Sequence, residues 1–486
     1  MNYTVLCNMT PAEDRLNDAL RRDDEAAVAE LLQQAIEAPP ARLQPWIDAA
    51  RSIDRSDLGA KLLEASEPNA QRRFAALQLW SETGRAVAAK MAHLLKDAPA
   101  DDPRRLQLAG ALELEGDAAA AIAMLAEFLE QAPGWLAGQQ ALAQLRWTQG
   151  DDAPLASFDA AVAQQQQNEA LHAAWLSTVK AMEAHDRLPA DIGVAMERFG
   201  QSGLIAMVAA DGYSELGMAQ EADVLFGALA KIENPDFDAT RARHAMRYGR
   251  PDLAARFAAP GAARHNHGEC WAWLGAALRA SDDPRSDWFH RGASLFAEHS
   301  IDLTDADRVE LAAHLGALHK GSAPPLGQSP RGGTQTMGPL LKRREAPIIG
   351  LRRAVRSAVR GFIEALPPTE QEHPFLSRPR QSFRFEGSWS IRLRPQGHHV
   401  AHIHSHGWIS SALYVDLPEE VAGNADRKGW LQIGAPPSWV KGAMPPIDHI
   451  EPAPLKLALF PSIFWHGTVP FDAGERLTVA FDVVPR

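Results

Sequence analysis

The sequence predicts a multidomain α+β fold, in which a long α-helical repeat domain precedes a smaller β domain. From about residue 10 to residue 319, apolar residues recur every three or four positions, which is the period of an amphipathic helix. From about residue 383 onward, short apolar runs alternate with Gly and Pro turns, as in a β-sandwich or barrel. Between them, residues 320–346 include a stretch dense in Gly, Pro, Ser and Thr, which predicts a linker.

Breaks in the helical pattern recur at a nearly constant interval. Gly116 and Gly150 are 34 residues apart, and Gly217 and Gly249 are 32 apart. Breaks that fit the spacing more loosely are Gly84, His185-Asp186 and Asp23-Asp24. A helix-turn-helix unit with a period near 34 is the tetratricopeptide signature. We expect residues 10–319 to form a tetratricopeptide-like solenoid, with a generic helical bundle as the alternative. Such a stack either binds a peptide or protein on its concave face or serves only as a scaffold.

The segment after the linker predicts one more helix, from Ile348 to Leu366. The arginines on one side of it are Arg352, Arg353, Arg356 and Arg360. We interpret this side as a solvated helix face, and an acidic partner is the alternative. The β domain is expected to occupy residues 347–486 together with this N-terminal helix. A jelly roll is one β fold that suits such short strands, and its mouth can hold a ligand and a metal.

Composition excludes several classes of protein. The formal net charge of −12 argues against nucleic-acid binding, which usually needs a basic surface. Only Cys7 and Cys270 are present, so neither a disulfide framework nor a cysteine-based zinc site is expected. This favours a reducing, cytoplasmic location. The first ten residues lack the basic and apolar regions of a signal peptide, and no apolar run is long enough to span a membrane.

Histidines near the C-terminus predict a metal site. Those in the first group are His398, His399, His402, His404 and His406, and His466 follows much later. Residues two apart on a strand point to the same face, so His402 and His404 can bind one ion if the segment is extended. His466 follows another predicted strand. Two ligands from one strand and a third from another would leave coordination positions open, as in non-haem iron oxygenases. His406 is expected in a turn, and His398 and His399 at the surface or behind the ligands.

Arg476 lies ten residues after His466, within a predicted strand. A guanidinium inside a barrel needs an anionic partner, because an unpaired buried charge is costly. A carboxylate can accept two hydrogen bonds from the forked guanidinium, a bidentate fit that a lysine could not provide. Thr478 has the same parity on the strand and could add a hydroxyl. Together these residues indicate a metal site beside a pocket for an anion.

At these motifs the sequence resembles the 2-oxoglutarate/Fe(II)-dependent oxygenases that follow tetratricopeptide repeats in bacterial proteins. The matching stretches begin at Gly387, His402, Leu459 and Glu475, and the loop Arg331-Gly-Gly-Thr-Gln-Thr is similar to the lead-in of that family. The resemblance is strong over the last third of the chain and extends to the helical half only in architecture. It implies a double-stranded β-helix (jelly-roll, cupin-like) that binds Fe(II), with 2-oxoglutarate as cosubstrate.

The resemblance also implies roles for individual residues. His402 and His466 match metal ligands, Arg476 the residue that holds the distal carboxylate of 2-oxoglutarate, and Thr478 its hydroxyl helper. The wider superfamily has Asp or Glu where this chain has His404. We predict His404 as the third ligand, and the alternatives are Asp416 and His406. Tyr414 and Ser411 are expected in the 2-oxoglutarate pocket, or else as plain strand positions. Trp408, Phe464 and Trp465 are expected either to exclude water from the site or to fill the barrel core.

The predicted function is therefore a 2-oxoglutarate- and Fe(II)-dependent dioxygenase. It would use O2 to hydroxylate a side chain of a protein or peptide that the helical repeats present. One alternative is a non-enzymatic interaction protein with a structural or sensory metal in the barrel. A zinc hydrolase with three histidine ligands is another, but it has no general need for Arg476.

Overall fold

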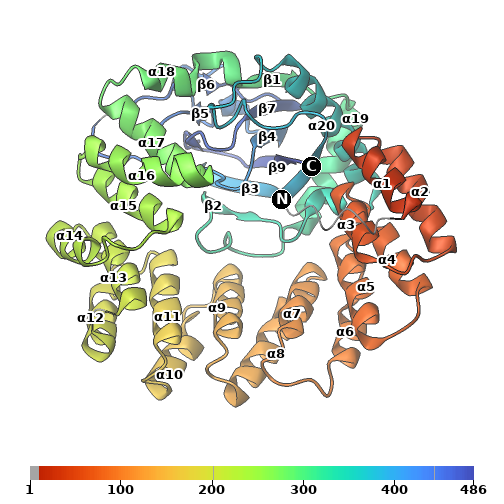
Figure 1. Cartoon of the computed structure of the whole chain (residues 1–486), viewed down its shortest axis with the longest axis horizontal. Coiled ribbons are helices and arrows are strands. Elements are labelled where there is room, and N and C mark those ends of the chain that lie inside the picture. The colour runs from red at the N-terminus through yellow and green to blue at the C-terminus, as the bar shows by residue number, and fades with distance from the viewer. Residues whose placement is uncertain (1–9, 201, 443) are drawn as a thin grey trace.

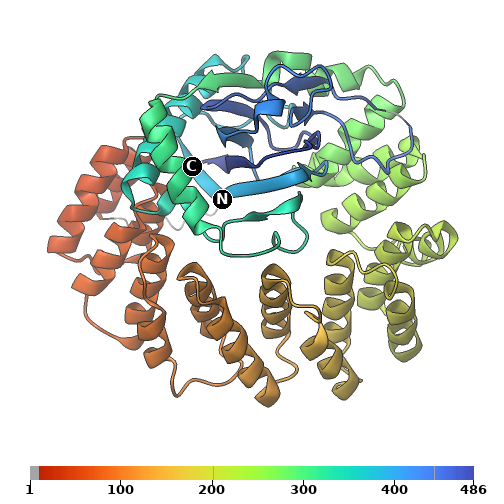
Figure 2. The same ribbon diagram turned by 180° about the vertical axis from the view of Figure 1, so that it is seen from behind.

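The computed structural model describes residues 10–200, 202–442 and 444–486. Within these residues, an arch of α-helices and a C-terminal β domain together close into a ring (Figure 1). The arch starts beside the β domain, runs around the opposite side and returns to the β domain at its other end. Figure 2 shows the same closure from behind. The open interior of the ring faces strand β2 and the loops on either side of it.

Helices of the arch follow one another in antiparallel pairs. Their bounds are α1 Pro11–Arg21, α2 Glu25–Glu37, α3 Gln44–Ser52, α4 Ser56–Ala65, α5 Ala70–Glu82, α6 Ala88–Leu94, α7 Arg104–Leu114, α8 Ala118–Gln131, α9 Leu136–Gln149, α10 Ala156–Gln164, α11 Glu169–Ala181, α12 Leu188–Phe199, α13 Gly203–Glu215, α14 Ala219–Ala228, α15 Pro235–Arg247, α16 Pro251–His265, α17 Gly268–Ala280 and α18 Arg285–His290.

The predicted breaks lie at turns between paired helices. Gly116 separates α7 from α8, and Gly217 separates α13 from α14, with φ of 88° and 82° respectively. Glycine reaches this left-handed region without the steric cost that a Cβ adds. Asp117 then caps α8, because its side chain accepts a hydrogen bond from the Ala120 amide. Local sequence thus sets where each helix of a pair ends and the next begins.

The β domain contains two antiparallel sheets among the described residues. Its strands are β1 Ala297–Ser300, β2 Pro330–Gln335, β3 Phe383–His399, β4 Ile409–Asp416, β5 Leu431–Ile433, β6 Asp448–Ile450, β7 Lys456–Pro461, β8 His466–Thr468 and β9 Arg476–Pro485. The larger sheet has the order β1-β7-β4-β9-β3-β2, and the smaller has the order β6-β5-β8. An isolated bridge between His402 and His466 extends the smaller sheet.

Helices α19 (Asp305–Leu318) and α20 (Ala346–Ala365) pack together, and both contact the larger sheet. On α20 the buried residues Leu351, Val355 and Val359 join the core of the β domain. Full burial of each such side chain contributes roughly 1.5–3 kcal/mol. Short 3-10 turns at Gly292–Leu295, Leu340–Lys342 and Glu419–Val421 complete the described elements.

Two segments differ from the sequence expectation. Strand β1, which was expected within the helical half, pairs with β7. Strand β2, which was expected within the linker, pairs with β3. Both are edge strands, so backbone pairing with the sheet stabilises sequences that carry little β pattern of their own. The linker is also attached to the arch, because the Ser322 amide donates to Thr148 O over 2.8 Å and the Trp147 indole donates to Pro324 O.

The interpretation of the arginines on α20 as a solvated face is wrong for three of the four. Arg352 donates to Asp54 and Glu25 at 2.9 Å, and Arg356 lies 2.6 Å from Asp23. Arg360 also pairs with Asp23. Asp23 and Asp54 lie at the turns after α1 and α3, and Glu25 begins α2, so the start of the arch itself supplies the acidic partner. In contrast, Arg353 is exposed and has no ion pair among the described residues.

Other expectations concern cysteines and membranes. Cys7 and the first nine residues lie outside the described part of the chain. Cys270 is buried, its thiol donates to Pro235 O, and burial raises its pKa to about 12. In the described ranges, no helix combines the length and apolar character needed to cross a bilayer.

Candidate metal and anion site

Three histidines converge where the two sheets of the β domain meet. His402 and His404 lie on the segment after β3, and His466 begins β8. One ligand atom from each lies within 4.8 Å of those from the other two. Reciprocal backbone hydrogen bonds of 2.9 and 3.0 Å between His402 and His466 fix two of the rings side by side. The backbone amide of His404 donates to Ser462 O, which holds the third.

The Nδ1 atom of each ring has its own acceptor. In His402 it lies 2.9 Å from Val400 O, and in His466 it lies 2.9 Å from Phe464 O. Nδ1 of His404 lies 2.6 Å from a carboxylate oxygen of Asp482. An acceptor at Nδ1 selects the tautomer with its proton there. All three rings are therefore set to offer an unprotonated Nε2 to a metal ion.

Burial supports the same protonation state. It lowers the pKa of His402 to about 3, and it lowers the pKa of His466 well below the ordinary value. Neighbouring histidines lower both pKa values further. These two rings are therefore neutral at physiological pH, which is the form that binds metals.

Asp482 on β9 supplies the negative charge that three imidazoles lack. Its side chain is largely buried, and besides His404 it accepts a hydrogen bond of 2.6 Å from the Ser410 hydroxyl on β4. A carboxylate behind a histidine ligand orients the ring and raises its basicity. Sequence reasoning missed Asp482. It lies in the matched C-terminal motif, but nothing in the spacing links it to a histidine 78 residues earlier.

Arg476 and Tyr414 form the anion side of the site. Both side chains are fully buried and line the same cavity, of about 50 Å³, as the three histidines. The guanidinium of Arg476 donates to Gly429 O at 2.8 Å, while its Nε has no partner among the described residues. The Tyr414 hydroxyl also lacks one, and burial raises its pKa to about 12, so the phenol keeps its proton. A buried cation and a buried donor without acceptors fit a bound carboxylate.

Thr478 and Ser411 also line the cavity. The Thr478 hydroxyl makes only a long contact of 3.5 Å to Ile391 O, so it is available to a ligand. In contrast, the Ser411 hydroxyl donates to Phe481 O at 2.9 Å and accepts from the Phe481 amide at 2.8 Å. Ser411 therefore ties β4 to β9, and its hydroxyl is already used by the backbone.

Both alternatives to His404 lie away from the cluster. The Asp416 side chain is 62% exposed and lies 3.6 Å from Arg308. His406 is exposed in a turn, as expected. His398 is half-buried and does not line the cavity, whereas His399 lines it and stacks on His402 at 5.9 Å between ring centroids.

The aromatic wall consists of residues that differ from the expected ones. Trp408 and Phe464 belong to the core of the β domain, and Trp465 packs on Trp273 of α17 at 4.5 Å between ring centroids. None of the three is among the residues that line the cavity, and all three belong to apolar clusters, which agrees with the alternative that they fill the core. The apolar residues that line the cavity include Trp389, Ile391, Leu431 and Phe460.

Residues 387–482 match the family model described as "Putative 2OG-Fe(II) oxygenase". The C-terminal part of the chain is thus similar to a 2-oxoglutarate/Fe(II) oxygenase domain, which indicates an oxidoreductase. The cofactors that go with this domain are iron(II) and 2-oxoglutarate. The matched range contains His402, His404, His466, Arg476 and Asp482. The comparison with curated proteins gives no match.

Several solved structures are similar to parts of the chain. A prolyl-4-hydroxylase from Pseudomonas putida is 16% identical, with a TM-score of 0.28 over 44% of this chain and 99% of that chain. HygX from Streptomyces hygroscopicus, with nickel and 2-oxoglutarate bound, is 11% identical, with a TM-score of 0.27 over 42% and 87%. The APC/C hetero-tetramer Cut9-Hcn1 is 13% identical, with a TM-score of 0.31 over 59% and 60%. TM-scores this low carry no functional conclusion.

Proposed function

We propose that this protein is a 2-oxoglutarate- and Fe(II)-dependent dioxygenase that hydroxylates a side chain of a protein or peptide. One observation carries the proposal. Three histidines with anchored Nδ1 atoms share a cavity with the buried Arg476, whose Nε has no partner among the described residues. A structural metal site would need the three rings but not the buried cation beside them.

In this proposal His402, His404 and His466 bind iron through Nε2. Asp482 compensates for the missing carboxylate ligand by holding His404 from behind. This arrangement keeps the negative charge near the ion while the coordination sphere stays neutral. Three protein ligands leave positions for 2-oxoglutarate and O2.

Arg476 binds the distal carboxylate of 2-oxoglutarate, and Thr478 and Tyr414 donate hydroxyl hydrogen bonds to it. Ser411 acts indirectly, because its hydroxyl fixes β4 against β9. The cavity walls formed by Trp389, Leu431 and Phe460 exclude water from the reacting atoms.

When bound, iron and 2-oxoglutarate supply the oxidation: one oxygen atom of O2 enters succinate as CO2 leaves, and the other enters the C–H bond of the substrate. The chain itself positions the groups. Burial keeps the histidine lone pairs free, and the Arg476 cation orients the cosubstrate in a site with little water.

The fold is consistent with separate parts for oxidation and for binding the substrate. We propose that the strand orders β7-β4-β9-β3 and β6-β5-β8 are the two faces of a jelly-roll, or double-stranded β-helix, and that the oxygenase unit starts near β1 rather than at residue 347. We further propose that α1–α17 are a tetratricopeptide-like stack that presents the substrate. The interior of the arch faces β2 (Figure 1), and Gln335 of β2 borders the metal cavity together with Gln328 and Ser329, which come just before the strand.

The test starts with anaerobic addition of iron(II) and 2-oxoglutarate to the full-length protein. A weak visible charge-transfer band should form, and it should be lost in His402→Ala and retained in His406→Ala, a matched change at the exposed turn. With O2 and a panel of cell proteins, succinate release should follow. A band that is absent from the wild type, together with no succinate under any condition, would overturn the proposal and favour a structural metal.

A further inference from the structure

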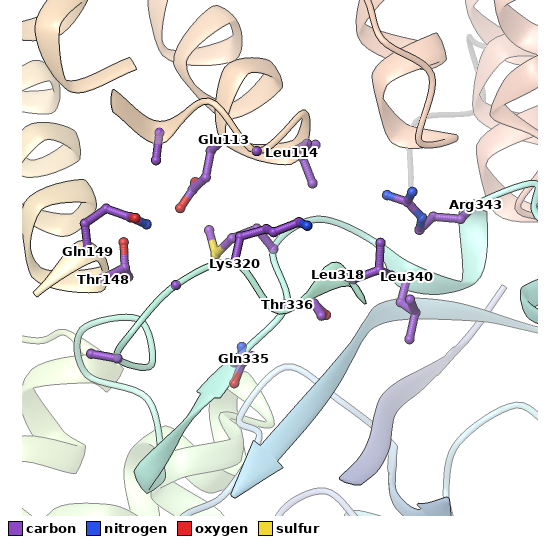
Figure 3. A pocket seen from close by; sticks show the side chains of 15 residues that line it. Glu113, Leu114, Thr148, Gln149, Leu318, Lys320, Gln335, Thr336, Leu340 and Arg343 are labelled. Carbon is purple, nitrogen blue, oxygen red and sulfur yellow. The ribbon is translucent and has the colours of Figure 1, made fainter. Parts of the chain in front are cut away.

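A second pocket lies inside the ring, between the arch and the β domain (Figure 3). It encloses about 90 Å³, which is room for one side chain. The arch contributes Glu113 at the end of α7, and Thr148 and Gln149 at the end of α9. The β domain contributes the end of β2, and Lys320 lies on the segment between them.

The pocket is next to the metal cavity. Gln335, the last residue of β2, lines both. Its register partner on β3 is Ile391, which also lines the metal cavity. A polypeptide with one side chain in this pocket would therefore lie beside the metal cavity.

Glu113 is the carboxylate of this pocket. Figure 3 shows its side chain directed from α7 into the pocket, toward the segment that carries Lys320. Within the described residues, no hydrogen bond or ion pair reaches this carboxylate, and burial alone raises its pKa to about 7. Because Glu113 is half-buried, its carboxylate is only partly solvated, and a cation would relieve the free-energy cost of that desolvation.

The other polar groups favour the same kind of ligand. The side-chain amides of Gln149 and Gln335 have no partner in the described part of the chain, so each offers a free carbonyl oxygen. Of the two cations that line the pocket, Arg343 already pairs with Glu345, whereas Lys320 is exposed and has no ion pair among the described residues. A carboxylate with amide oxygens around it matches the donors of an ammonium or guanidinium group.

We propose that this pocket binds a Lys or Arg side chain of the substrate polypeptide and thereby positions a nearby residue for oxidation. Glu113 pairs with the cation, and Gln149 and Gln335 accept its remaining hydrogen bonds. The inference rests on the proposed function, which it deepens by giving the substrate class: a polypeptide with a basic residue close to the oxidised one.

Peptide binding tests this without turnover. Four capped, randomised nonapeptide libraries carry Lys, Arg, Leu or Glu at the central position, and their retention on full-length protein is measured at physiological salt. The wild type should retain the Lys and Arg libraries over the Leu library. In Glu113→Gln that preference should fall roughly tenfold, the change expected for one charge-assisted hydrogen bond. Glu113→Asp, which keeps the charge, should retain part of it.

Glu130→Gln is the matched control, because it removes the same charge from an exposed position of the neighbouring α8. It separates local pairing from the attraction of cations to a protein of net charge −12. Equal preference of the wild type and Glu113→Gln for the Lys and Arg libraries would overturn the proposal. So would preference for the Glu library that is lost in Lys320→Ala, because the pocket would then bind an acid.

The two proposals fail separately. Retention needs neither iron nor 2-oxoglutarate, so Glu113-dependent binding without any succinate release would refute the dioxygenase and leave the pocket assignment intact. Succinate release with peptide binding that ignores Glu113 would refute the pocket assignment alone.

Discussion

The carboxylate of Asp482 lies 2.6 Å from Nδ1 of His404, across 78 residues of sequence. This contact places a carboxylate directly behind the histidine that we propose as the third metal ligand. In the proposed site the negative charge therefore lies on Asp482, behind a ligand, rather than on a ligand itself.

Asp482→Asn should lower the affinity for iron(II) by about 10- to 100-fold, because the ring keeps an acceptor but loses the charge behind it. Anaerobic iron titration measures this. Asp472→Asn is the control, since that exposed carboxylate pairs with Lys428 on the same domain. Equal iron affinity in the wild type and Asp482→Asn would show that Asp482 has no positioning role.

Arg476→Gln should weaken 2-oxoglutarate binding by at least about 30-fold, the effect of truncating one partner of a buried charge pair. Iron affinity should stay the same. Because the buried guanidinium is incompletely paired without its anion, the melting temperature of the ligand-free protein should not fall. Calorimetric titration and thermal melts check both. Arg392→Gln, which loses only an exposed pair with Glu475, should bind 2-oxoglutarate normally.

Arg352→Ala should destabilise the closure of the ring by about 3–5 kcal/mol, because it leaves the buried Asp54 without its cation and removes one of the cations that pair with Glu25. Burial already raises the pKa of Asp54, so this carboxylate depends on its partner. Hydrogen exchange should accelerate in α1–α4 before the β domain is affected. Arg353→Ala, one position along the helix on its exposed side, should change neither. Unaltered exchange in Arg352→Ala would contradict a role in closure.

Glu113→Gln should change the pH dependence of stability. The pKa of Glu113 is about 7 in the folded protein and near 4.5 when exposed, so its favourable contribution is complete below pH 4.5 and is lost as pH rises through 7. As the pH rises from 5 to 8, the melting temperature of the variant should therefore increase relative to that of the wild type. Calorimetry at the two pH values measures the difference, and Glu130→Gln should show none.

Local patterns in the sequence predict much of this protein. The three- and four-residue periodicity predicts the helices, and glycines such as Gly116 and Gly217 mark their turns, because a left-handed φ is a local property. The spacing of His402 and His404 and the position of His466 likewise indicate which residues meet, since strand parity decides side-chain direction. Edge strands β1 and β2 were missed, because their pairing depends on a sheet formed elsewhere.

What the sequence alone determined was the order of helices and strands and the candidate ligands. The tertiary structure decided the partners: Asp482 behind His404, Asp54 beside Arg352 at a separation of 298 residues, and Glu113 facing β2. Charge pairing acts through space and leaves no periodicity along the chain. The sequence alone therefore cannot distinguish a solvated arginine on a helix from one that pairs with a distant acid. The arch and the β domain create the pocket around Glu113 by closing on each other, whereas the residues that line the metal cavity all come from 328–480.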